Sequence, residues 1–283
     1  MSTATVVTAP RLPGLLPLAL VRAGVELRAF LRERDAVIFI LAYPVVMFAI
    51  FASVFGADQQ VAQTGGGEVS VGFAQYFLPG MLATGLMLTS FQSLAVSVAL
   101  ERDDGTLKRL RATPVPAAAY FLGKVGQILA VSVVQVAALL ALAHYGFDVP
   151  LPTTASAWAT FAWVFLLSTA TGAVLGVAFS SVPRSGRSAA PVVTSVVLVL
   201  QFVSGVFFAF FSLPTWMQTV ASVFPLKWTA QGMRSVFLPD EARLLEVSGS
   251  WQHGLTAAIL VAWLVVGLVV GVRTFRWRRR DDG

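Results

Sequence analysis

Residues 36–57 read AVIFILAYPVVMFAIFASVFGA, a run without Asp, Glu, Lys, Arg or His. An α-helix of this length rises about 33 Å, enough to cross the hydrocarbon core of a bilayer, which is about 30 Å thick. A charge at the bilayer centre costs about 2.5–3.5 kcal/mol on insertion scales, so long uncharged runs indicate membrane spans. This stretch predicts an integral membrane protein.

Similar uncharged runs recur along the 283-residue chain. With 57% hydrophobic and 12% charged residues and a mean hydropathy of +0.77, the chain is too apolar for a soluble protein. We therefore predict one all-α transmembrane domain over residues 1–283, because strands of a barrel would alternate apolar and polar residues. Its six expected spans cover about 36–57, 75–100, 116–145, 157–181, 189–211 and 252–273.

Basic residues fix the expected orientation of these spans. If the N-terminus is cytoplasmic, 17 of the 20 Lys and Arg residues fall in cytoplasmic segments. Lys227, Arg234 and Arg243 are left outside, and Gly65 to Gly67 lie in the first outer loop. By the positive-inside rule, both termini are expected in the cytoplasm.

A further helix is expected before the first span, at about 15–34. One face of this segment is apolar at helical spacing: Leu20, Gly24, Leu27 and Leu31. The other carries charges: Arg22, Glu26 and Glu33. This pattern is typical of an amphipathic helix in the plane of the inner membrane interface. A cytoplasmic helix packed on a partner is the alternative.

The fifth uncharged run, 188–226, is too long for one crossing, since as a helix it would measure about 58 Å. Pro214 starts a new helix, and Pro225 and Pro239 interrupt its continuation. We therefore predict two short re-entrant helices at about 214–238, dipping into the outer leaflet. Lys227 and Arg234 would then lie at the lipid headgroups.

Catalytic and ATP-binding motifs are missing from the sequence. His144 and His253 lack the H-E-x-x-H context of a zinc protease, and Gly123-Lys124 is followed by Val125 rather than the Ser or Thr of a phosphate-binding loop. No carboxylate lies inside the uncharged runs, and cysteine is absent. We expect neither an enzyme nor a metal or cofactor site in this chain, so any ATP is used by another polypeptide. The basic residues flank apolar runs, which argues against nucleic acid as a partner.

The loop after the second span, residues 101–116, reads ERDDGTLKRLRATPVP. Acidic residues at its start and basic ones at its end suit the dipole of a short helix at about 103–113, which Pro114 ends. Leu107 and Leu110 form an apolar pair among charges. This pair indicates a helix docked into a groove on a cytoplasmic partner. The alternative is a connector whose leucines touch the membrane.

This loop resembles one found in permeases of the type-2, exporter-type ABC transporters, particularly the bacterial drug-resistance branch related to the daunorubicin exporters. The matching residues are Glu101-Arg102, Gly105-Thr106-Leu107, Arg109-Leu110, Arg111-Ala112-Thr113-Pro114 and Gly123-Lys124. A second set is similar to the family's outer re-entrant helices: Leu213-Pro214-x-Trp216, Phe224-Pro225-Leu226 and Gln231-Gly232-x-Arg234. The pair Asp103-Asp104 departs from the single acidic residue more usual there.

The resemblance implies that two permeases, homodimeric or heterodimeric, pair above two cytoplasmic ABC ATPase subunits that hold ATP and Mg²⁺. It assigns ATPase coupling to these residues: Glu101, Arg102, Gly105, Thr106, Leu107, Arg109 and Leu110. It also implies a central path lined by spans two and five, for which aromatic and amide side chains suit apolar cargo. The path candidates are Phe91, Gln92, Gln201, Phe202, Phe207 and Phe208.

The expected function is the permease subunit of an ATP-driven exporter for hydrophobic or amphipathic compounds, such as drugs, lipids or lipid-like metabolites. The expected location is a bacterial inner membrane, where drug efflux would confer antibiotic resistance. A lipid or polysaccharide exporter of the same family is one alternative. A non-transporting membrane anchor or sensor for a cytoplasmic complex is the other.

Overall fold

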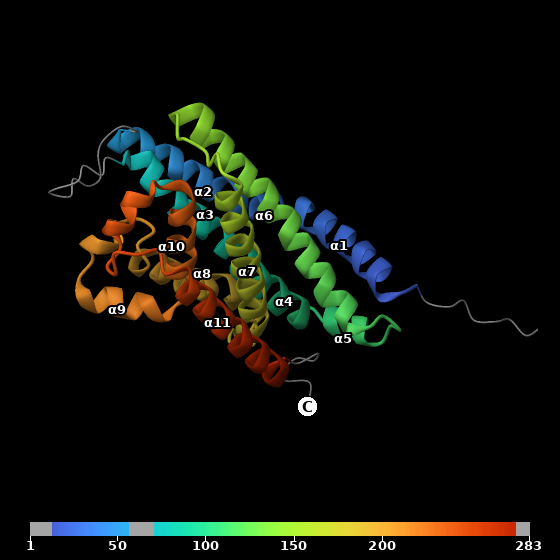
Figure 1. Cartoon of the computed structure of the whole chain (residues 1–283). Helices are drawn as coiled ribbons and strands as arrows, with labels where there is room; N and C mark the ends of the chain where they lie inside the picture. Colours follow the sequence, from blue (N-terminus) through green and yellow to red (C-terminus); the bar gives the residue numbers. More distant parts are fainter. Residues whose placement is uncertain (1–12, 57–70, 276–283) are drawn as a thin grey trace, which may run out of the picture.

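The computed structural model describes residues 13–56 and 71–275 as a bundle of long helices running side by side (Figure 1). Gly65 to Gly67 and the basic residues after Phe275 lie outside the described residues. Six helices are long and apolar enough to cross a membrane. They are α2 (Arg34–Phe55), α3–η1–α4 (Phe73–Asp103), α6 (Ala117–Phe147), α7 (Ala155–Phe179), α8 (Gly186–Val203) and α11 (His253–Thr274). The prediction of an all-α protein with six spans is confirmed.

Span two, the continuous helix Phe73–Asp103, forms the centre of the bundle. In the most apolar 18-residue stretch of span two, the protein itself buries 78% of the residues. The corresponding share is 22% for α2 and α11 and 28% for α8. Helix α10 (Pro225–Phe237), α2, α6, α7 and α8 all pack against some part of span two. The peripheral helices therefore carry the lipid-facing surface, and span two carries the interior.

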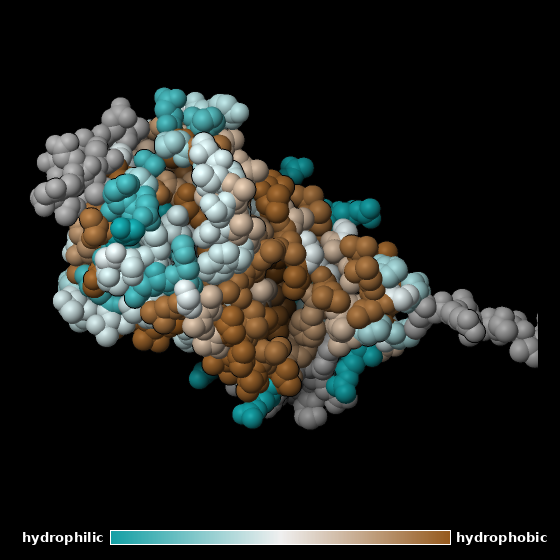
Figure 2. All heavy atoms as spheres, viewed as in Figure 1, coloured by the Kyte–Doolittle hydropathy of each residue, from teal (hydrophilic) through white to brown (hydrophobic). Residues whose placement is uncertain are grey.

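A hydrophobic band crosses the middle of the molecule. Figure 2 shows it where α11 and its neighbours lie in Figure 1, with hydrophilic residues gathered on either side. On α11 the band includes exposed Val265, Leu268 and Val272. Such a surface suits lipid hydrocarbon, in agreement with a multi-pass membrane protein.

The fifth span ends earlier than the sequence predicts. Helix α8 stops at Val203, whereas the expected span continued to residue 211. Gly205 adopts a φ of +70°, and a Cβ atom there would lie 2.8 Å from the Cβ of Phe210. The chain therefore turns sharply at Gly205, and the apolar composition of this stretch gives no sign of the turn. Phe207 and Phe208 follow in an irregular segment before the short helix η2 (Phe210–Ser212).

Two short helices occupy the segment expected to be re-entrant. They are α9 (Thr215–Val223) and α10, which begins at Pro225, and the 3₁₀ helix η3 (Asp240–Leu245) follows Pro239. Proline suits a first helical position because no helical partner is needed for its missing N–H. Helix α10 packs on α3, α7 and α11, so its backbone is shielded by protein. Its depth in the bilayer stays a prediction.

Helix α1 (Leu15–Arg32) packs along α6 with its charged face turned inward. Glu26 is buried, and a Cβ atom at Gly123 of α6 would lie 2.5 Å from Cγ of Arg22. The outward face is apolar, with Leu16 and Leu20 exposed. Arg22 and Glu26 thus face α6, whereas Arg28 and Arg32 are exposed. An in-plane position at the membrane interface, with the apolar face toward lipid, stays a prediction.

Candidate coupling site and internal cavities

The loop after span two folds into a tight helical hairpin. Helix α4 (Ser93–Asp103) ends span two, and α5 (Thr106–Arg111) follows after a turn at Gly105, whose φ is +78°. The carboxylate of Asp104, which precedes the N-cap residue Gly105, accepts a 2.7 Å hydrogen bond from the N–H of Thr106 and so satisfies the first N–H of the new helix. Nη2 of Arg109 donates to Oγ1 of Thr106 at 2.9 Å. The helix expected over about 103–113 is thus shorter than predicted, 106–111, and is separated from span two by the turn at Gly105.

Leu107 faces the interior of the chain. It is fully buried and packs with Leu94, Val98, Tyr120 and Ile128, while Leu110 lies half-buried beside this cluster. Because its own chain covers Leu107, the interpretation of both leucines as a knob for a partner is wrong for Leu107. The apolar side of α5 holds the helix onto spans two and three, and its outward side is left for contacts with other molecules.

The outward side of α5 is basic. Lys108, Arg109 and Arg111 are exposed, whereas Thr106 is only partly so. A small cavity of about 220 Å³ lies at the end of the helix, where Leu110 and Arg111 meet Val115 and Pro116. A partner at this surface would therefore need to match positive charge as well as shape.

Glu101 belongs to a buried ionic cluster that we define by Arg22, Glu26, Glu101, Tyr120 and Lys124. Lys124, only 3% exposed, pairs with Glu101 and lies 2.7 Å from Oε2 of Glu26, which also pairs with Arg22. The hydroxyl of Tyr120 donates to Oε2 of Glu101 at 2.7 Å. The ionic cluster ties α1, α4 and α6 together directly behind the loop, so Glu101 positions the loop from within.

Arg102 ties the same loop to span four. Its Nη2 donates to the carbonyl oxygen of Ser180 at 2.7 Å, at the end of α7. Of the seven predicted coupling residues, the structure therefore turns Glu101 and Leu107 inward, uses Arg102 as a link, and leaves Arg109 outward. Movement of α5 must pass to α1, α6 and α7 through these contacts.

Span two contains a π-helical turn, η1 (Leu88–Gln92), halfway along its length. The hydroxyls of Thr89 and Ser90 donate back to the carbonyls of Gly85 and Leu86, which competes with regular helical bonding. A Cβ atom at Gly176 of α7 would lie 2.7 Å from the carbonyl oxygen of Phe91. The small-residue pair Gly172 and Gly176 thus lets α7 pack directly on the wider turn, as the GxxxG spacing indicates.

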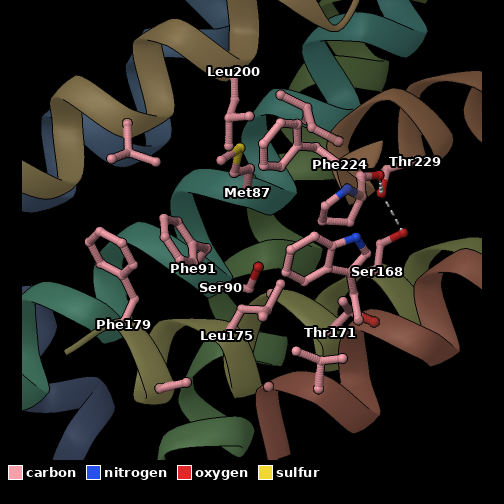
Figure 3. Close-up of a pocket in the computed structure, with 18 of the residues that line it drawn as sticks. Met87, Ser90, Phe91, Ser168, Thr171, Leu175, Phe179, Leu200, Phe224 and Thr229 are labelled. Atoms are coloured by element: carbon pink, nitrogen blue, oxygen red, sulfur yellow. Dashed lines mark hydrogen bonds between the residues drawn. The ribbon is translucent and has the colours of Figure 1, made fainter. Parts of the chain in front are cut away.

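An apolar cavity of about 460 Å³, which we call the main cavity because it is the largest of the three described here, lies beside this turn among span two, α7, α8, α10 and α11. Figure 3 shows Met87, Phe91, Phe179 and Leu200 around it, with few polar groups. Two of these, Ser168 and Thr229, are hydrogen-bonded to each other at 2.9 Å. A cavity of this size with apolar walls suits a lipophilic molecule or a lipid chain. Only Phe91 among the predicted path residues lines it.

The other path candidates lie elsewhere. Gln92 lines a different cavity, between α1–α2 and α4. Gln201 is buried and accepts a 3.2 Å hydrogen bond from the hydroxyl of Tyr43. Phe207 packs between Phe51 and Phe202, whereas Phe202 and Phe208 are 50% and 55% exposed. A single chain therefore does not bring the six candidates together.

Sequence reasoning also misplaced two outer charges. Arg234 is 1% exposed and its Nε donates to Glu246 at 2.5 Å, while Lys227 is 5% exposed, bonds to Gln231 and lies 3.6 Å from the ring centroid of Trp228. Neither lies at a headgroup-exposed surface as expected. Burial opposes the charge of Arg234, but the carboxylate of Glu246 raises its pKa above the ordinary value. The sequence did hold a signal for this ion pair: Glu246 follows Arg234 closely enough along the chain to balance its charge when both are buried.

Comparison with known proteins agrees with this architecture. Residues 21–238 match the family described as ABC-2 type transporter. The chain is also similar to ABC transporter G family member 20 of Dictyostelium discoideum, with 27% identity over 203 residues, covering 71% of this chain and 26% of the relative. It thus spans about a quarter of that relative's length. Because the family match runs from α1 through the coupling loop to the end of α10, the chain belongs to the ABC-2 type transporter family.

Proposed function

We propose that this membrane protein is the permease subunit of an ATP-driven exporter that moves hydrophobic or amphipathic compounds out of the cytoplasm. One observation carries the proposal. Span two ends in the hairpin of α4 and α5, whose outward side is basic, and the π-helical turn of the same span borders the main cavity. A force applied to α5 therefore acts on a wall of that cavity. The family assignment supplies the transporter context.

The proposed partners are two cytoplasmic ABC ATPase subunits that bind ATP and Mg²⁺. The exposed residues Lys108, Arg109 and Arg111 would fit an acidic groove on such a subunit. Closure of the ATPases on ATP would shift α5, and buried Leu107 would pass the shift to α4. Alternating access follows if this motion favours an outward-open arrangement of the spans.

A second permease, identical or related, completes the proposed transporter. Phe202 and Phe208 leave half of their surface exposed near the end of α8. Pairing of two chains at this edge would bury these rings and place both copies of span five along a shared path. Phe202 and Phe208, with the partly exposed Phe207, then belong to the interface of the pair rather than to a cavity within one chain.

The chemistry of the main cavity favours drugs, lipids or lipid-like metabolites over polysaccharides. A sugar chain needs many hydrogen-bonding groups, whereas this cavity is lined mostly by aliphatic and aromatic side chains. Its hydroxyl groups at Ser168 and Thr229 satisfy each other. The basic-residue asymmetry supports both termini in the cytoplasm, and a bacterial inner membrane is the proposed location.

Charge reversal on α5 tests the proposal. In the variant Arg109→Glu/Arg111→Glu, repulsion should release the ATPase, while the fold is kept because both side chains are exposed. We expect co-purified ATPase activity and efflux of a lipophilic dye to fall at least about tenfold. The matched control Arg28→Glu/Arg32→Glu makes the same charge change on exposed residues of α1.

Membrane expression and thermal unfolding of each purified variant show whether the fold survives. Undiminished ATPase binding and efflux in the α5 variant, at wild-type expression, would contradict a coupling role. An equal loss in both variants would indicate a general effect of charge at the inner membrane surface and would also count against α5 as the docking element.

A further inference from the structure

A second cavity of about 310 Å³ lies between the α1–α2 elbow and helices α4 and α6. It touches the ionic cluster at Glu26, Glu101 and Lys124, and it reaches Gln92 of the π-helical turn. We call it the inner cavity. Gln92 and Asp104 lie about 18 Å apart along α4 at 1.5 Å per residue, so the inner cavity follows most of this helix.

The walls of the inner cavity are amphipathic. Its apolar side chains include Phe30, Phe39, Ile40, Val96 and Leu100. Aromatic and aliphatic walls with a few polar groups are typical of sites for small organic molecules. The volume lies at the lower end of the range for such sites, about 300–1,000 Å³, which favours a compact ring system over a long lipid chain.

The charges that line the inner cavity are mostly negative. Four carboxylates, those of Glu26, Glu33, Glu101 and Asp104, face one ammonium group, Lys124. Lys124 and the nearby Arg22 are already engaged by Glu26 and Glu101. Glu33 and Asp104 are exposed, and one carboxylate oxygen of Asp104 accepts the N–H of Thr106. Among the charged side chains that line the inner cavity, carboxylates therefore outnumber basic groups, which favours a cation over an anion at this site.

Gln92 gives the inner cavity an unsatisfied polar group at depth. Its side chain is only 8% exposed, and its buried Oε1 has no hydrogen-bond partner among the described residues. A buried amide oxygen without a partner costs about 1–3 kcal/mol, so a native protein normally supplies one. Gln92 is the last residue of the π-helical turn, and such turns occur frequently at functional sites. A ligand N–H group would satisfy this oxygen.

We propose that the inner cavity binds an amphipathic organic cation that carries N–H groups. Its ring system lies against Phe30 and Phe39, an N–H group donates to Oε1 of Gln92, and the carboxylates of Glu33 and Asp104 at the mouth attract its positive charge during entry. The proposal rests on the proposed export function and narrows it to a cargo class. Because Asp104 also accepts the first N–H of α5, an occupied cavity acts directly on the coupling hairpin.

Ethidium is a suitable probe, since it combines an aromatic cation with two exocyclic amino groups. Its binding to the full chain in phosphatidylcholine nanodiscs is measured by fluorescence, without any ATPase. We expect Gln92→Leu and Glu33→Gln/Asp104→Asn each to weaken binding by about 3- to 10-fold. The amide oxygen introduced by Asp104→Asn is expected to accept the N–H of Thr106 as the carboxylate does. The control Glu241→Gln removes an exposed carboxylate of η3, far along the chain, and should bind as wild type does.

The anionic dye 1-anilinonaphthalene-8-sulfonate supplies the charge test. Its displacement of ethidium should be weak. Equal binding of ethidium by wild type and both cavity variants, or equal competition by the anion, would overturn the proposal. Since Glu33 and Asp104 are exposed, their variant keeps the test valid even if Gln92→Leu fails to fold. Added phosphatidylethanolamine distinguishes two sources of the same chemistry: displacement of ethidium identifies a lipid ammonium group as the occupant, and no displacement identifies a diffusible amine.

Efflux of uncharged Nile red separates this proposal from the export function. Nile red efflux by a variant that has lost ethidium binding would support export and the inner cavity together. Intact ethidium binding without efflux of either dye would contradict the export function but would support the proposed cation site in the inner cavity. Intact efflux with no measurable ethidium binding in wild type would overturn the inner cavity alone.

Discussion

At the scale of single residues, the protein keeps its buried charges by supplying each with a close partner. Lys124 is buried on a candidate span, yet it contacts two carboxylates, Glu26 and Glu101. Desolvation of an ammonium group costs several kcal/mol, and opposite charges at contact distance offset that cost. The ionic cluster is therefore stable only while its members remain complete.

Removing Lys124 should destabilise the protein strongly. In Lys124→Met the packing volume is kept, but the buried carboxylates of Glu26 and Glu101 lose their shared partner. We expect a loss of about 3–5 kcal/mol in the free energy of unfolding, measured by thermal unfolding in detergent. Lys108→Met on exposed α5 is the control, and the double variant Lys124→Met/Glu101→Gln should recover part of the loss. Unchanged unfolding of Lys124→Met would mean that the ionic cluster contributes little.

Lys227 should make stability depend on pH. The pKa of Lys227 is lowered to about 8, because burial, the largest cause, and the nearby Arg234 lower it more than the carboxylate of Glu246 raises it. The unfolded chain keeps an ordinary Lys, so between about pH 8 and 10.5 it binds more protons than the folded protein, and stability rises with pH in that window. Below pH 8 both states are protonated and the burial penalty is complete.

The measurement compares wild type with Lys227→Met at several pH values. The variant lacks the penalty, so its stability advantage should shrink by up to about 3 kcal/mol as pH rises from 8 to 10.5. Loss of the hydrogen bond to Gln231 lowers the variant equally at every pH. A stability difference that stays constant with pH would show that Lys227 titrates normally.

The buried charges also mark where sequence reasoning stops at this scale. A run of uncharged residues reveals a span without knowledge of its neighbours. The partners of Lys124 lie in α1 and α4, and the partner of Arg234 lies beyond the end of α10. Pairs of this kind depend on how helices pack, which no single segment records. Leu107 was misassigned for the same reason, since only tertiary contacts show that its own chain covers it.

At the scale of elements, contact between α7 and the π-helical turn of span two depends on glycine. Gly176→Ala would place a methyl group 2.7 Å from the carbonyl oxygen of Phe91 and 3.1 Å from Cβ of Leu94. Because backbone cannot move aside as a flexible side chain can, we expect a net loss of about 1–3 kcal/mol, despite the better helix propensity of alanine.

Gly254→Ala in α11 is the matched control, because no atom lies within 4 Å of a Cβ atom there. Thermal unfolding of both variants, together with dye efflux, checks the expectation. Equal stability of the two variants would show that α7 and span two can separate without cost. That outcome would remove the structural reason for a glycine at this contact.

The ends of helices were predictable where the amino-acid composition changes along the chain. They were less predictable where the composition stays the same. The charges that flank the six apolar runs predicted the spans, and Pro214 and Pro225 predicted the starts of the short helices α9 and α10. The end of α8 was missed because the residues after Val203 are as apolar as the helix itself. Only the positive φ of Gly205 separates them. The amphipathic pattern of α1 predicted which residues share a face, but not that Arg22 and Glu26 would pack against α6.

At the scale of the whole molecule, the basic asymmetry predicts which end faces the cytoplasm. The natural chain has no cysteine, so single substitutions can be labelled without background. Ala112→Cys beside α5 and Ser248→Cys after η3 are both exposed. We expect a membrane-impermeant maleimide to label position 248 in intact cells and position 112 only after permeabilisation.

The reverse pattern would overturn the orientation, and labelling of both positions from one side would contradict an odd number of crossings between them. Thr154→Cys, in the loop between α6 and α7, is an internal reference because it lies one crossing away from α5 and should label from outside. The agreement between hydropathy and the helical bundle gives the number of crossings, but only labelling gives their direction.

The π-helical turn determines what the loss of a single codon would do to span two. A regular helix advances about 100° for each residue, and a π-helical turn accommodates one more residue than the regular repeat needs. Deleting Thr89, for example, would remove the extra residue and return the helix to its standard pitch, while the residues from Ser93 to the basic hairpin would keep nearly the same rotational phase relative to α3. The wider turn thus absorbs one residue without rotating the two halves of the central helix against each other, so an in-frame loss at this point would remove the bulge and leave the hairpin facing the same way.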